Sequence, residues 1–307
     1  MSSSTALLPK NKKDEHPIFL RVCHSPWMNI GQKALVGLRG LTAIYMAVSL
    51  SMIINYDVGV NKHGWSTVFE PPNIAYFTST LYQWIAATWT FMHLHYPHHR
   101  SGTQTASTRF QRFLSPPRQQ ESAKNKTWFS IFYFAAVTFP HLSTLIHWTI
   151  LVPQNQATIP ADKTFGHDWY TDFFVANKYA IVSLISLIEV FVYSSIRRPT
   201  PPTPQIAGIS FLSALYIGWA YAGHEITGRY AYFFLDHKTV GPGNTAGAIV
   251  AFIASANACK LTFNYSWTLL MIMIVFGFNL GLTALREYLA QKSEQLLKNN
   301  GYTSLSQ

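Results

Sequence analysis

The stretch WFSIFYFAAVTFPHLSTLIHWTILV, residues 128–152, is apolar over 25 residues and contains no Lys, Arg, Asp or Glu. A helix needs about 20 apolar residues to cross the hydrocarbon core of a bilayer, so this stretch predicts a membrane-spanning helix. Five further apolar stretches predict spans at 37–55, 75–95, 174–196, 206–223 and 262–285. The expected fold is therefore an all-α integral membrane bundle of six transmembrane helices.

Basic residues gather in alternate connections between these spans. The segments before the first, third and fifth spans, together with the tail after the sixth, hold 16 of the 23 Lys and Arg residues. Loops of this kind are retained in the cytoplasm. We therefore predict an N-in, C-in orientation, with a cytoplasmic arm over 1–36, a transmembrane domain over 37–285 and a cytoplasmic tail over 286–307. The first 30 residues are polar and of mixed charge, so no cleavable signal peptide is expected, and the endoplasmic reticulum and the plasma membrane both remain open as locations.

Composition supports a membrane protein and argues against a nucleic-acid partner. Only 12% of the residues are charged, about half of what a soluble chain usually carries. The net charge of +10 comes from cations beside apolar spans, where orientation and anionic headgroups account for them. The two cysteines, Cys23 and Cys259, do not form a disulfide framework. The expected partners are membrane lipids, and the oligomeric state is left open.

Several polar side chains are expected near one membrane interface, because alternate spans begin and end there. They are Thr78, His147, Asn177, Lys178, Tyr179, His224, Glu225 and His237. Ionisable groups at membrane depth are costly, which makes them candidates for a functional site. The alternative is that each one anchors the end of its helix among the headgroups.

The strongest local motif is HEITGRYAYFFLDH, residues 224–237, followed by Gly241-Pro242-Gly243. This order of a His, a Thr-Gly pair, a Tyr, Phe-Leu-acid-His and Gly-Pro-Gly resembles the androgen-induced-gene-like family of polytopic membrane proteins. Weaker matches extend the resemblance over most of 70–260; they are Phe77-Thr78, Phe139-Pro140 and Leu187-Ile188-Glu189.

Members of this family are multi-pass hydrolases that cleave fatty acid esters of hydroxy fatty acids with a membrane-embedded Thr nucleophile and a His. The resemblance implies that Thr78 is the nucleophile, that the substrate is a lipid ester, and that no cofactor or metal takes part. It also places His224, Tyr232 and His237 on the active face, the last two as substrate-binding residues. A hydroxyl attacks an ester when a base lies within hydrogen-bond reach. The alternative for Thr78 is an ordinary helix hydroxyl bonded to its own backbone.

One departure from the family pattern concerns the base. The family's catalytic His lies ten residues before the Glu that matches Glu189, and this position is Tyr179 here. A Tyr has a pKa near 10 and is a poor base at neutral pH. Three alternatives follow. His147 or His224 serves as the base; Tyr179 and Lys178, both also expected to contact substrate, act as an unusual base pair; or the chain is a non-catalytic relative that binds lipids or acts as a scaffold.

The segment His95-Tyr-Pro97-His98-His99 suggests a different chemistry. It resembles one histidine box of the membrane di-iron desaturases, and imidazole-rich sites bind iron. That family needs several boxes on the cytoplasmic face, whereas most other histidines here are predicted on the opposite face, and Pro97 interrupts the helix. We therefore expect no metal.

Besides Lys178, two charged residues fall inside predicted spans. Arg39 lies in the first turn of its span, and we expect its side chain to reach the cytoplasmic surface. Glu189 lies in the middle of its span, where a carboxylate must be neutral or paired. The expected partner is His141, deep in the preceding span.

Overall fold

The computed structural model describes residues 18–95, 113–117, 123–153, 155, 169–197, 203–254, 279–293 and 295. Every regular element within these ranges is helical. In chain order they are α1 (Ile18–Val22), α2 (Gln32–Gly59), η1 (Gly64–Phe69), α3 (Pro71–His95), α5 (Ala123–Ile146), η2 (His147–Leu151), α6 (Trp169–Ala176), η3 (Asn177–Ile181), α7 (Val182–Ile188), η4 (Glu189–Tyr193), α8 (Thr203–Thr227), η5 (Phe233–Leu235), α9 (His237–Val240) and α10 (Pro242–Ala254). A further helix covers residues 279–293.

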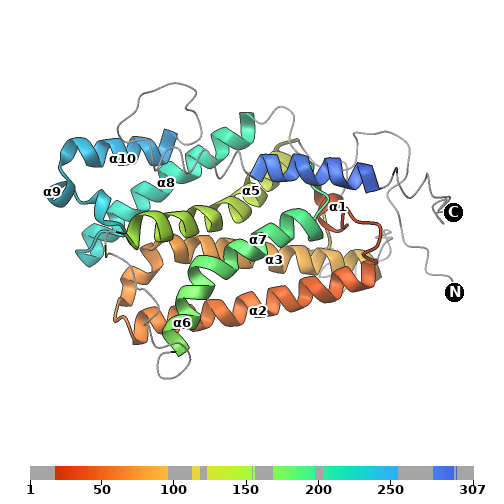
Figure 1. Ribbon diagram of the computed structural model, residues 1–307, viewed down its shortest axis with the longest axis horizontal. Coiled ribbons are helices and arrows are strands. Elements are labelled where there is room, and N and C mark those ends of the chain that lie inside the picture. The colour runs from red at the N-terminus through yellow and green to blue at the C-terminus, as the bar shows by residue number, and fades with distance from the viewer. Residues whose placement is uncertain are drawn as a thin grey trace.

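The long helices run side by side along the length of the molecule (Figure 1). α5 contacts α3, α7 and α8, and α3 also packs against α2. α1 and the helix over 279–293 lie at one end of this bundle, whereas η1, α6 and α9 lie at the other end. The two ends therefore carry different chain segments, and the polar residues described below belong to the end with η1.

Within the described residues, four helices are long and apolar enough to cross a membrane: Gln32–Gly59, Asn125–Leu151, Trp169–Tyr193 and Thr203–Thr227. They contain the spans expected at 37–55, 128–152, 174–196 and 206–223, apart from a few residues at the ends. The span expected at 75–95 lies in α3, which has the required length but does not reach the mean hydropathy of those four helices. The span expected at 262–285 lies mostly outside the described residues. Four apolar helices that could cross a membrane are thus present, and the total of six and the orientation stay predictions.

The outward face of α2 is apolar. Its exposed side chains include Leu38, Leu41, Ile44, Val48 and Ile54. In water such a stripe would cost free energy in proportion to its exposed area. A lipid environment removes that cost, which agrees with α2 being a membrane helix.

The structure corrects the expectations for Arg39 and Glu189. Arg39 does not reach the surface: its side chain is fully buried, and Nη2 donates to Glu189 Oε1 at 3.1 Å. The hydroxyl of Tyr82 and the amide of Gln83 also donate to this carboxylate, at 2.8 and 3.2 Å. His141 bonds instead to the hydroxyl of Ser183. A guanidinium offers more donors than an imidazole, and it satisfies a buried carboxylate better.

The N-terminal segment is packed onto the bundle. Phe19, Val22 and Cys23 are buried, and the indole of Trp27 donates to the carbonyl of Phe191 at 2.6 Å. Burial raises the pKa of Cys23 to about 12 even though Arg39 is nearby. The Cys23 thiol is therefore held in its unreactive protonated form.

Candidate functional site

Three π-helical turns, one between α6 and α7 and two at the C-terminal ends of α5 and α7, carry polar residues of the spans. η2 begins at His147, η3 contains Lys178 and Tyr179, and η4 begins at Glu189. A π turn inserts one residue into a helix and shifts the side chains that follow; such turns are frequent at functional sites. η2 and η3 meet directly, because the rings of His147 and Tyr179 stack with centroids 3.6 Å apart and planes 10° apart.

Lys178 is the centre of a buried ionic network. Its ammonium donates to Asp57 Oδ2 and to Glu70 Oε2, each at 2.8 Å. The amide of Asn73 donates to Asp57 Oδ2 at 2.9 Å, and the amide of Asn61 to Asp57 Oδ1 at 3.0 Å. Lys178 and Asp57 are each 1% exposed in their side chains. The network links the end of α2 and the start of α3 to η3, and the charged groups of Lys178 and Asp57 in it are buried away from water.

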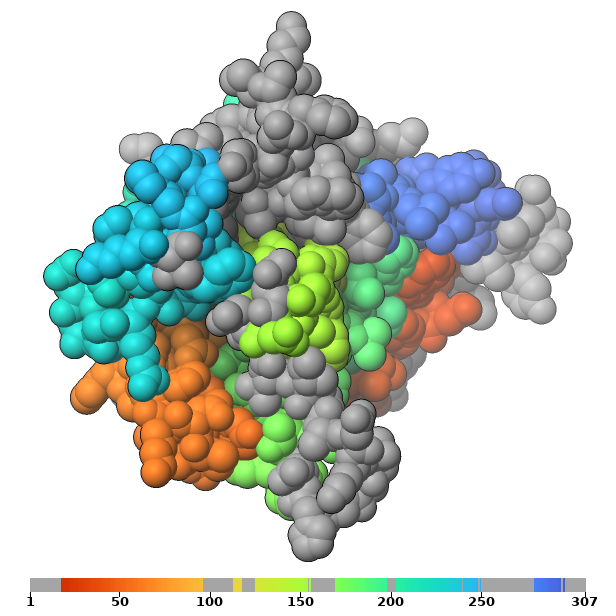
Figure 2. All heavy atoms as spheres, turned by 60° about the vertical axis from the view of Figure 1, so that its left-hand side comes forward, coloured from red at the N-terminus to blue at the C-terminus, as the bar shows by residue number. Residues whose placement is uncertain are grey.

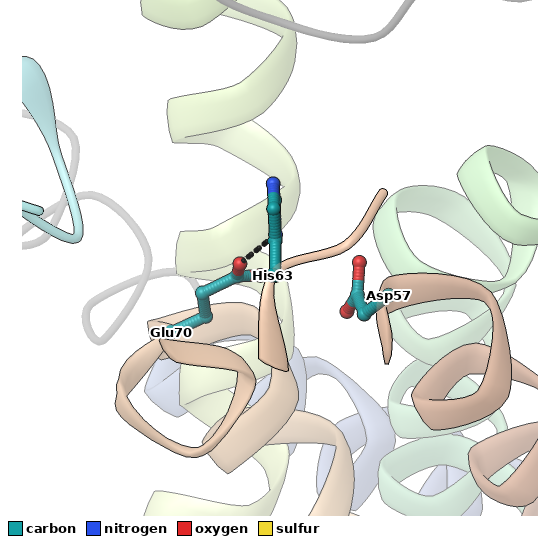
Figure 3. A group of neighbouring side chains, drawn as sticks. All are labelled: Asp57, His63 and Glu70. Atoms are coloured by element: carbon teal, nitrogen blue, oxygen red, sulfur yellow. Dashed lines mark hydrogen bonds and ion pairs between the residues drawn. The ribbon is translucent and has the colours of Figure 1, made fainter. Parts of the chain in front are cut away.

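Asp57, His63 and Glu70 form a compact group next to this lysine (Figure 3). Their ligand atoms lie within 4.8 Å of one another, and Nδ1 of His63 is 2.6 Å from Glu70 Oε1. Carboxylates and imidazoles are common metal ligands. Here, however, the ammonium of Lys178 is bonded to both carboxylates and takes the position that a cation would take between them. We therefore assign this group to the lysine and not to a metal ion.

The His63–Glu70 pair gives the network a dependence on pH. The hydrogen bond to Glu70 raises the pKa of His63. Burial alone would raise the pKa of Glu70, but the charge of Lys178 and the bonds from His63 and Lys178 lower it to about 2. The stabilisation from Glu70 is present above its unfolded pKa of about 4.3 and is lost as pH falls through its folded pKa. The stabilisation from His63 is present below its unfolded pKa of about 6.5 and is lost as pH rises through its raised pKa.

Replacing His63 with Gln should therefore lower the thermal midpoint of the purified protein at about pH 5.5 more than at about pH 9. The measurement is a series of thermal unfolding curves in detergent across this range. His237→Gln, which changes an exposed histidine, is the matched control and should leave the pH dependence unchanged. An equal loss for His63→Gln at both ends of the range would contradict the pairing.

A polar cavity of about 290 Å³ opens beside the network. Its wall includes Asp57, His63, Glu70, His147, Lys178, Tyr179 and Tyr232. Figure 2 brings this end of the molecule forward, with the segment after α2 (orange) beside the segment around η5 and α9 (cyan). The cavity thus collects side chains from four separate parts of the chain.

An apolar cavity of about 690 Å³ adjoins the polar one. It lies between α3, α5 and α8, and its wall includes Ile74, Thr78, Phe139, Leu142, Ile146 and Leu215. Tyr232 lines both cavities. The chain also passes from one to the other between Ile146, which lines the apolar cavity, and His147, which lines the polar one. The two spaces are therefore neighbours, with very different chemistry.

The expected site residues are divided between these cavities. Thr78 lines the apolar cavity, and its hydroxyl donates to the carbonyl of Ile74 at 2.7 Å. His147 lines the polar cavity, is 2% exposed, and has no hydrogen-bond partner on either ring nitrogen among the described residues. Lys178, Tyr179 and Tyr232 line the polar cavity too. The structure thus brings His147, Lys178, Tyr179 and Tyr232 together at the polar cavity, while Thr78 lies in the adjoining apolar cavity.

Two expected residues lie apart from both cavities. His224 stacks on Tyr230 with ring centroids 3.7 Å apart, and only Tyr230 lines the polar cavity. His237 begins α9 and is exposed. Gly228, the second residue of the Thr-Gly pair, has a φ of 70°; it directly follows the end of α8 at Thr227 and turns the chain back toward the cavity wall. The 224–243 motif therefore contributes Tyr230 and Tyr232 to the wall of the polar cavity, and neither His224 nor His237 lines that cavity.

Sequence reasoning missed Asp57, His63 and Glu70. A signal for them existed: an intramembrane lysine requires a counterion, and Asp57 and Glu70 flank the connection between the first two predicted spans. His63 lies in the same connection and had no signal of its own.

Comparisons with known proteins found no matching family model, no matching curated protein and no matching solved structure. The resemblance to the androgen-induced-gene-like family therefore rests on the motifs quoted above.

Proposed function

We propose that this protein is a membrane lipid ester hydrolase in which the Thr78 hydroxyl attacks the ester. The observation that supports the proposal most is the pair of adjoining cavities, one apolar and holding Thr78, the other polar and holding His147. Ligand pockets commonly combine a mostly apolar wall with a few converging polar groups. Acyl chains suit the apolar cavity, and the polar end of the same lipid suits the other.

His147 is the side chain that best fits the role of base. Its nitrogens have no protein partner among the described residues, so one of them can accept the proton of a hydroxyl. His224 lines neither cavity. Lys178 is held in its charged form by two carboxylates, which removes the physical basis for a Lys178–Tyr179 base pair.

The proposed chemistry has two steps. Thr78 Oγ1 first leaves its bond to the Ile74 carbonyl and attacks the ester carbon, while His147 takes its proton and passes it to the departing alcohol. Water then attacks the acyl-Thr78 ester and releases the fatty acid. Hydrogen bonds between nucleophile and base often form only in the substrate complex, which accommodates the Thr78–Ile74 bond of the free protein.

The resemblance implies fatty acid esters of hydroxy fatty acids as substrates, and these are the first lipids to assay. The competing function is that of a non-catalytic lipid-binding or scaffold protein of the same fold. Two observations favour it: Tyr179 replaces the family's His, and the Thr78 hydroxyl is bonded to its own helix.

Labelling with a fluorophosphonate lipid probe tests the proposal. The purified full-length protein should react, and Thr78→Ala should abolish the labelling, because the probe needs an activated hydroxyl. Thr88→Ala is the matched control: Thr88 makes the same kind of bond on the same helix, to the carbonyl of Trp84, and lines neither cavity. His147→Ala should slow labelling by about 100-fold or more.

Two results would count against the hydrolase. Undiminished labelling of Thr78→Ala would place the reactive group elsewhere. Folded wild-type protein that does not react at all would favour the non-catalytic lipid-binding function.

A further inference from the structure

The polar cavity holds two carboxylates and one permanent cation, and aromatic rings surround it. The carboxylates of Asp57 and Glu70 face the ammonium of Lys178, and the imidazole of His63, bonded to Glu70, adds a second positive charge only when it is protonated, so acid is in excess whenever His63 is neutral. Five rings complete the wall: Phe174, Tyr179, Tyr230, Tyr232 and Phe233. Excess acid and ring faces both attract a cation.

The hydrogen-bonding capacity of the two carboxylates is already in use. Asp57 accepts from Asn61, Asn73 and Lys178, while Glu70 bonds to Lys178 and His63. A ligand with N–H donors gains few bonds in such a cavity. A quaternary ammonium has no N–H donors and interacts only with charges and ring faces. The lack of free hydrogen-bond acceptors in the cavity therefore does not weaken its binding.

Lys178 shows that this wall stabilises an ammonium. Its Nζ lies 4.6 Å from the ring centroid of Phe174 and 5.7 Å from that of Tyr179. Both distances fall within the range of cation–π contacts.

An independent observation in the same cavity points to a ligand. His147 is 2% exposed, and neither of its ring nitrogens has a partner among the described residues. A buried polar group of this kind is costly unless something bonds to it. A neutral imidazole offers one N–H, which fits an oxygen of a phosphodiester or an ester.

We propose that the polar cavity binds the quaternary ammonium headgroup of a choline lipid whose acyl chain enters the adjoining apolar cavity. The assignment rests on the proposed lipid site and deepens it. A lipid that ends in a free carboxylate would face Asp57 and Glu70, so the assignment separates this chain from the substrates that the resemblance implies. Tyr179, which stands where the family has its His, is part of this cavity wall. The proposed difference in substrate therefore coincides with the departure from the family motif.

Dissociation constants of four probes test the headgroup preference. The probes are dodecylphosphocholine, dodecyltrimethylammonium, laurate and free choline, below their micellar concentrations, on the full-length protein in a mild detergent. The two probes with a chain and a quaternary ammonium should bind about tenfold more tightly than laurate. Free choline should bind more weakly than either, which distinguishes a lipid headgroup from a soluble amine. Laurate binding as tightly as dodecyltrimethylammonium would overturn the proposal.

Variants of Tyr232 separate ring contacts from general packing. Tyr232→Leu should weaken dodecyltrimethylammonium about tenfold and leave laurate unchanged, whereas Tyr232→Phe keeps the ring and the preference. Phe233→Leu provides a second cavity variant if Tyr232→Leu does not fold. Phe211→Leu, which changes an exposed ring on α8 outside both cavities, is the control. An unchanged preference in Tyr232→Leu and Phe233→Leu would overturn the proposal.

Binding is measured here on the wild-type protein and without turnover, because none of the four probes contains a carboxylic ester. Failure of Thr78 to react would therefore defeat the hydrolase and leave the headgroup preference standing. Loss of the preference with intact labelling would defeat the headgroup assignment alone.

Discussion

Lys178→Met is expected to lower the free energy of unfolding by about 3 to 5 kcal/mol, which is the usual cost of removing one partner from a buried ion pair. The substitution keeps the size of the side chain and removes its charge. Asp57 and Glu70 then lose the ammonium that lies 2.8 Å from each of them. Asp57 is fully buried and cannot recover the loss from water. The connection between α2 and α3 should loosen with it.

Thermal unfolding in detergent measures this effect. Lys238→Met, an exposed lysine near the same end of the molecule, is the matched control and should change the midpoint little. Adding Asp57→Asn to Lys178→Met removes one unpaired charge and should restore part of the stability. A midpoint for Lys178→Met equal to that of the control would show that the network does not form.

Glu189→Met is expected to cost a similar amount, about 3 to 5 kcal/mol, because it leaves the guanidinium of Arg39 buried without a counter-charge. Arg39 is fully buried, and its Nε and Nη1 have no partner among the described residues. The same change also removes the acceptor of Tyr82 and Gln83. The pair ties α2 to η4, so its loss should separate the first apolar helix from the third.

The double variant Arg39→Met with Glu189→Met distinguishes an unpaired charge from lost packing. Replacing a whole buried ion pair by apolar residues is often neutral, so the double variant should recover most of the midpoint. Glu225→Gln, at an exposed position, is the control. A double variant less stable than Glu189→Met alone would contradict the pairing.

The apolar spans were predictable because their signal is local and continuous. Residues 128–152 predict a membrane helix without any knowledge of the rest of the chain, and the structure has a helix over Asn125–Leu151 that is long and apolar enough to cross a membrane. The gathering of His147, Lys178 and Tyr179 at one end followed from the alternating direction of the spans. The buried ion pairs could not be predicted in this way. Arg39 and Glu189 are 150 residues apart, and nothing local to either residue selects the other.

The division of the candidate site into two cavities could not be predicted from the sequence either. Alternation of spans gives the end of the bundle at which a residue lies, but not the direction in which its side chain points. The π turn η3 inserts an extra residue between α6 and α7 and so changes that direction for the residues that follow, and no sequence pattern predicts it. Thr78 and His147 were therefore expected at one interface, while the partition between an apolar and a polar wall emerged only in three dimensions.

Trapping of the acyl-enzyme tests the central claim most directly. The full-length protein is incubated with a lipid ester, quenched in acid, and mapped by peptide mass spectrometry. We expect an acyl adduct on Thr78 that is absent from Thr78→Ala and accumulates more slowly in His147→Ala. Ester turnover with an adduct on another residue, or with none on Thr78, would contradict it.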